Sequence, residues 1–67
     1  MDLRNVIYEV RLAERHASEG DYEYAHMAEK KAWEMALAAI EAGAPNAQEL
    51  AKEALKTKSI EFARWYA

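Results

Sequence analysis

The sequence contains no cysteine. A chain without thiols forms neither a disulfide framework nor a thiolate zinc site, and it has no cysteine nucleophile. Its 67 residues amount to one small domain, near the lower size at which a core holds a fold without such staples. We therefore expect a single domain over residues 1–67, stabilised by side-chain packing and too small for a deep cleft.

Long apolar runs and a strong positive charge are also missing. The longest uninterrupted apolar run covers residues 35–40, far short of the ~20 residues that a membrane-spanning helix needs. The net charge is −3, whereas a general nucleic-acid surface needs a basic stripe. We expect a soluble chain that binds neither membrane nor nucleic acid, and no signal in it specifies a localisation.

Glycine and proline are scarce, and those present mark helix boundaries. Gly20 suits the position just after a helix, and Asp21 suits the N-cap of the next one. Gly43 and Pro45 end the second periodic segment in the same way, and Asn46 suits the start of the third. These signals divide the chain into three helical segments.

The three segments predict an all-α fold with helices at about residues 2–19, 21–42 and 46–66. Loops this short make consecutive helices run antiparallel. No alternating run of β-branched residues competes with the helical pattern. We expect an up-down-up antiparallel three-helix bundle.

The first segment has two apolar stripes. At roughly 100° per residue, one stripe suits the core and consists of Leu3, Val6, Ile7, Val10, Ala13 and Ala17. Tyr8 and Leu12 fall on the opposite side, and a bundle this small buries only one side of a helix. We predict that Tyr8 and Leu12 form a protein-binding surface, with Asn5, Arg15 and His16 beside them for polar contacts.

The other two segments have broad apolar arcs. In the second, the bulky flank must supply most of the buried volume, so we assign to the core Trp33, Leu37 and Ile40. The residues left over for the surface are Tyr24, Met27 and Met35. In the third segment, the arc expected to face the core or its rim consists of Ala47, Ala51, Ala54, Leu55, Phe62, Trp65 and Tyr66.

Residues suited to catalysis or metal binding are few. Glu23 and His26 have the Glu-x-x-His spacing of carboxylate-bridged dimetal bundles, but no other segment repeats it. Ser18 and Ser59 lack a histidine and an acid at spacings that would activate a nucleophile, and there is no glycine-rich phosphate loop. We therefore expect no catalytic residue, cofactor or metal site.

The helix pattern resembles that of the MIT (microtubule interacting and trafficking) domain. The matching residues of the first two segments are Leu3, Ile7, Val10, Ala13, Gly20, Tyr22, Ala25, Ala32, Leu37 and Ile40. The run from Lys52 to Phe62 is similar to the third helix of that family. This resemblance implies grooves beside the third helix that receive short helical or extended motifs from filament-forming membrane-remodelling proteins. Trp65, Tyr8 and Leu12 depart from it, because the family has polar residues there.

The chain also resembles computationally designed three-helix miniproteins. Alanine occupies 15 of the 67 positions, the loops are minimal, and propensity, capping and apolar pattern agree along the chain. In a designed protein, large apolar residues on an outer face mark the intended interface. We therefore expect a non-enzymatic, designed protein-binding module that engages another protein through Tyr8 and Leu12.

Two alternatives stay open. One is an MIT-like adaptor whose contacts lie along the third helix and include Lys58 and Arg64. The other is a structural or self-associating bundle, a homo-oligomer in which the outer stripe of the first helix pairs with its own copy.

Overall fold

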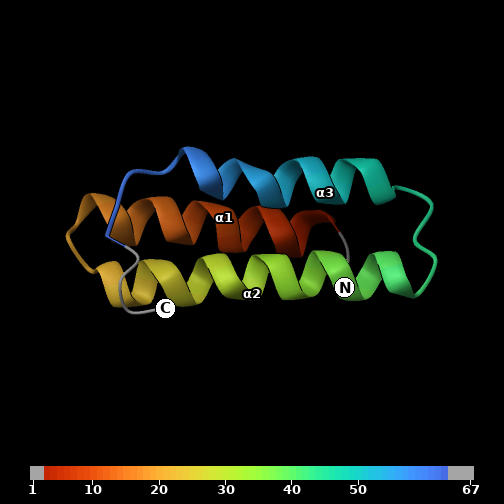
Figure 1. Cartoon of the computed structure of the whole chain (residues 1–67), viewed down its shortest axis with the longest axis horizontal. Helices are drawn as coiled ribbons and strands as arrows, with labels where there is room; N and C mark the ends of the chain where they lie inside the picture. The colour runs from red at the N-terminus through yellow and green to blue at the C-terminus, as the bar shows by residue number, and fades with distance from the viewer. Residues whose placement is uncertain (1–2, 64–67) are drawn as a thin grey trace.

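A computed structural model describes residues 3–63. It contains three helices, α1 (Leu3–Ser18), α2 (Tyr22–Glu41) and α3 (Ala47–Leu55), followed by a 3₁₀ turn, η1 (Lys56–Ser59). The helices lie side by side with alternating direction, in a bundle of 35 × 18 × 17 Å (Figure 1). The predicted all-α three-helix bundle is confirmed, and no strand occurs within residues 3–63. None of its described helices is long and apolar enough to span a membrane.

Both connections between helices close with the same backbone motif. Gly20 and Gly43 adopt φ values of 81° and 90°, which side chains with a Cβ rarely allow. In the first loop, the Asp21 N–H donates to the His16 carbonyl at 2.8 Å, as in a Schellman C-cap. An equivalent bond of 3.0 Å closes the second loop. Asp21 and Asn46 occupy the N-cap positions as predicted, although neither side chain makes a capping hydrogen bond within the described chain.

The third helix is shorter than predicted. It ends at Leu55 instead of near residue 66, and after η1 the backbone turns extended at Ile60. The hydroxyl of Thr57 and the indole of Trp33 both donate to the Ala54 carbonyl, at 3.1 and 3.0 Å. These two donors take up the carbonyl at the point where the α-helix gives way to 3₁₀ geometry. Of the arc predicted for this segment, Trp65 and Tyr66 lie outside the described residues.

Alanine forms most of the core. The buried apolar residues are Val6, Val10, Ala13, Ala25, Ala28, Ala32, Ala36, Leu50 and Ala54. The stripe predicted for α1 therefore faces inward, with Ile7 and Ala17 half-buried at its edges. On the flank of that stripe, Glu9 is buried and lies 3.8 Å from Lys31 Nζ.

The orientation predicted for α2 is wrong. Its alanine flank faces the core, while Trp33 and Leu37 of the bulky flank are 39% and 64% exposed. Met35, assigned to the surface from the sequence, is half-buried and packs against the core. Ile40 also packs against the core, as predicted. Alanine allows neighbouring helices to approach closely, so the small flank is buried at close range and the large flank is left at the edge.

The arc predicted for α3 is confirmed in part. Its alanines are buried or half-buried as expected, namely Ala54, Ala47 and Ala51. Leu50, which the predicted arc leaves out, is 1% exposed and is the largest fully buried side chain. Leu55, which the arc includes, is 54% exposed. Further along, Phe62 is half-buried and stacks on Tyr22 of α2, with ring centroids 6.4 Å apart.

Two leucines of α3 test this orientation. Leu50→Ala should lower the free energy of unfolding by about 2–5 kcal/mol, because it leaves a cavity in a core whose other members are small. Leu55→Ala removes the same atoms from the same helix at an exposed position and should cost less than about 1 kcal/mol. Urea unfolding measures both variants, and equal losses would contradict the burial assigned here.

Candidate functional site

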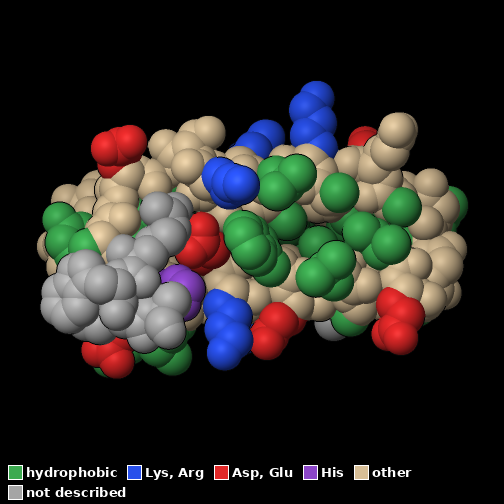
Figure 2. All heavy atoms as spheres, viewed as in Figure 1, with side chains coloured by type: hydrophobic (Ala, Val, Ile, Leu, Met, Phe, Trp, Pro, Cys, Tyr) green, Lys and Arg blue, Asp and Glu red, His purple; other side chains and the backbone are tan. Residues whose placement is uncertain are grey.

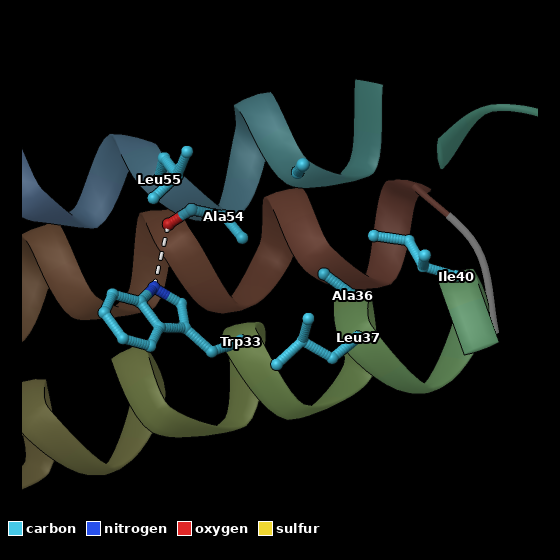
Figure 3. A pocket seen from close by; sticks show the side chains of 7 residues that line it. Trp33, Ala36, Leu37, Ile40, Ala54 and Leu55 are labelled. Atoms are coloured by element: carbon cyan, nitrogen blue, oxygen red, sulfur yellow. Dashed lines mark hydrogen bonds between the residues drawn. The ribbon is translucent and has the colours of Figure 1, made fainter. Parts of the chain in front are cut away.

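An apolar groove lies between α2 and α3. Its volume is about 240 Å³. The residues that line it all have apolar side chains apart from one indole N–H, and they are Trp33, Ala36, Leu37, Ile40, Ala51, Ala54 and Leu55 (Figure 3). In the space-filling view, apolar side chains gather along this groove on one face of the bundle (Figure 2).

The groove exists because small and large residues alternate around it. Ala36 and Ala54 are buried beneath it, and neither has a side chain long enough to fill the space between the helices. Leu37 on α2 and Leu55 on α3 stand beside them as walls, both more than half exposed. The result is a floor of methyl groups between two leucine walls, presented by rigid helices.

Trp33 closes one end of the groove in a fixed position. Its Nε1 donates to the Ala54 carbonyl oxygen at 3.0 Å and to Thr57 Oγ1 at 2.9 Å, and Thr57 is completely buried. The polar edge of the indole is therefore satisfied inside the fold (Figure 3). The partly exposed ring is held in place as an apolar surface.

The surface predicted on α1 is only partly apolar in the structure. Tyr8 is 62% exposed and lines a shallow hollow with Asn5, Arg4 and Glu9. Leu12 is half-buried instead of fully outward. The structure thus brings Tyr8 and Asn5 together. The other two residues that line the hollow, Arg4 and Glu9, are charged.

Arg15 and His16 of the predicted surface lie near the loop between α1 and α2, each close to an acidic side chain. Arg15 is exposed and lies 3.6 Å from Glu19. His16 is half-buried, with Nδ1 3.8 Å from Asp21 Oδ2 and its ring 5.7 Å from that of Tyr24. Arg15 therefore has an ion-pair partner four residues along the chain, whereas His16 Nδ1 is buried without a hydrogen-bond partner among the described residues.

Titratable groups form two local clusters. His26 Nδ1 lies 3.3 Å from Oε1 of the buried Glu29, so the carboxylate beside His26 belongs to Glu29 and not to Glu23 of the Glu-x-x-His spacing. At the first loop, one imidazole nitrogen of His16 and one carboxylate oxygen each of Glu19 and Asp21 lie within 4.8 Å of one another, and both acids are exposed. Neither cluster has the second histidine-carboxylate pair of a dimetal bundle.

The groove is not expected from the sequence, because the apolar pattern of α2 assigned Trp33 and Leu37 to the core. The signal that marks the true packing face is the spacing of the alanines on α2, at Ala25, Ala28, Ala32 and Ala36, which places four small side chains on one stripe. Of the surplus residues predicted for α2, Tyr24 and Met27 are exposed as expected, at 59% and 57%.

Trp33 and Thr57 provide a test of the groove's end wall. Trp33→Phe and Thr57→Val each remove part of one shared hydrogen-bond cluster, and each should lower the free energy of unfolding by about 1–2 kcal/mol. The double variant should lose at least ~0.5 kcal/mol less than the sum, because the two groups bond to each other. Urea unfolding of all four proteins gives the coupling, and strict additivity would contradict it.

Comparisons of the chain with protein-family models, with curated proteins and with solved structures return no match. What the structure itself establishes is a compact bundle of three helices with an apolar groove between α2 and α3.

Proposed function

We propose that this chain is a non-enzymatic protein-binding module and that its docking surface is the groove between α2 and α3. The observation behind the proposal is the exposure of Leu37 and Leu55 on either side of an alanine floor. These leucines add little to the packing of a single copy, and clustered apolar exposure of this kind is typical of interaction surfaces.

The form of the groove favours a helical surface as its occupant. Both walls of the groove are helices. The apolar side chains of a docked helix would pack between Leu37 and Leu55, which is the helix-in-groove mode of recognition. Trp33 adds an immobilised aromatic surface at one end. Rigid aromatic and aliphatic anchors of this kind supply most of the binding energy in protein interfaces.

The proposal extends to the class of protein that the sequence resembles. Alanine-rich helices, two minimal loops with the same glycine cap and an apolar helical surface are features of designed three-helix binders. An MIT-like adaptor is the alternative within the same proposal. It would also use a groove beside α3. Lys58 is exposed on η1, whereas Arg64 lies outside the described residues.

Tyr8 defines a second candidate interface. Its side chain is as exposed as that of Leu37, at 62% against 64%. The surface around it is the predicted one, with Leu12, Asn5, Arg15 and His16 on the same helix. We rank it second because Leu12 is half-buried and charged side chains line the hollow beside Tyr8.

A displayed library of amphipathic helical peptides distinguishes the two surfaces. Clones selected on the wild-type protein should lose most of their binding to Leu37→Glu, because a carboxylate in the groove cannot be desolvated without cost. The matched variant Tyr8→Glu should keep it. Both changes are at exposed positions and should shift the free energy of unfolding by less than about 1 kcal/mol.

The opposite pattern, with loss only in Tyr8→Glu, would move the interface to α1. A library that yields no binder sensitive to either substitution would contradict the proposed function.

A further inference from the structure

The two walls of the groove differ in charge. On α2, the exposed Glu34 and Glu41 are three residues before and four residues after Leu37, which places them on its side of the helix. On α3, the exposed Lys52 is three residues before Leu55. In the space-filling view, Lys and Arg side chains lie along the α3 side of the apolar patch, and mainly Asp and Glu side chains lie along the α2 side (Figure 2).

Opposite charges lie at the same level along the groove. The hydrogen bond from Trp33 to the Ala54 carbonyl sets α2 against α3, which runs in the opposite direction. Lys52 lies two residues before Ala54 in the sequence. Because α2 and α3 run in opposite directions, Lys52 is level with the α2 position two residues after Trp33. That level lies within one helical turn of Glu34.

This arrangement is self-complementary for one mode of pairing. A two-fold axis parallel to the groove places the α2 wall of one copy over the α3 wall of the other, so Glu34 meets Lys52 of the second copy twice. An axis across the groove would instead place each α3 wall, with its lysine, against another α3 wall. Electrostatic complementarity therefore selects the first arrangement.

The end of the groove near Trp33 fits this pairing less well. Lys30 is on the α2 wall there, and Lys58 of η1 is exposed close to the same level on the α3 side. Along its whole length, the α2 wall still has two carboxylates, of Glu34 and Glu41, and only one ammonium group, that of Lys30. The pairing is therefore centred on Leu37 and Lys52, away from Trp33.

The size of the face limits the strength of such a pair. A face of 35 × 18 Å buries at most roughly 600 Å² per copy, or ~1,200 Å² in total, which is the lower end of the range for specific interfaces. An interface of that size with only a few large anchors favours a weak, reversible dimer.

We propose that two copies of this chain pair groove to groove about an axis parallel to the groove, and that α2 and α3 of both copies enclose a second apolar core. This inference rests on the proposed function, since it names the occupant of the same groove. The second copy covers Leu37 and Leu55 when no other partner is bound, and other helical partners compete with it.

Analytical ultracentrifugation over a concentration series tests the pairing. The wild-type protein should show a reversible monomer–dimer equilibrium. Leu37→Glu should be monomeric at every concentration, and Tyr8→Glu, equally exposed on α1, should dimerise as the wild type does. A wild-type protein that stays monomeric at high micromolar concentration, or a dimer lost in Tyr8→Glu and kept in Leu37→Glu, would overturn the proposal.

Charge reversal tests the direction of pairing. Glu34→Lys and Lys52→Glu should each weaken dimerisation by about three- to ten-fold at low salt, and the double reversal should restore it to within about two-fold. Circular dichroism confirms that each variant is folded. Failure of the double reversal to restore the dimer would overturn the parallel arrangement.

Disulfide trapping gives an independent measurement of the direction. A mixture of Glu34→Cys and Lys52→Cys should form the mixed dimer under mild oxidation, while Glu34→Cys alone should cross-link slowly. Rapid cross-linking of Glu34→Cys alone would indicate the other axis and overturn the proposal.

The peptide library separates this inference from the proposed function. A monomeric protein whose groove binds helical peptides through Leu37 would refute the pairing and leave the proposed function intact. A dimer that depends on Leu37, with no peptide binder found, would support the pairing and contradict the proposed binding of other proteins.

Discussion

The close packing of α1 against the alanine face of α2 is the contact on which the rest of the structure depends. Ala32 and Ala36 of α2 lie in one buried cluster with Val6 and Val10 of α1. Small side chains on one helix let the other approach at short range, so this contact sets how α2 is rotated in the bundle. Once that rotation is set, the large residues of α2 cannot also face α1, and they lie at the boundary with α3.

The second determinant is the hydrogen-bonded cluster around Trp33. Its indole joins the end of α3 to the middle of α2 through Ala54 and Thr57. The same cluster lies where the α-helical geometry of α3 ends, and it fixes one end of the groove. A structural feature of the fold thus also positions the aromatic residue of the candidate interface.

Local signals predicted the helices and their connections well, because those signals act within a few residues. The positive φ angles of Gly20 and Gly43 follow from their places after apolar periodic segments. The early end of α3 was not predictable in this way. It coincides with hydrogen bonds to the Ala54 carbonyl, one of them from a residue 21 positions away in the sequence. A local pattern in residues 56–66 does not indicate a hydrogen-bond donor that lies on another helix.

The sequence by itself determined an all-α chain of three antiparallel helices, the two glycine-capped loops, the inward stripe of α1 and the exposure of Tyr8. Only the tertiary structure decided which flank of α2 is buried, and with it the location of the groove. Periodicity places apolar residues on an arc but does not rank the two halves of a broad arc. The choice depends on how closely a neighbouring helix can approach, and here the alanines allowed the closer packing and left Leu37 outside.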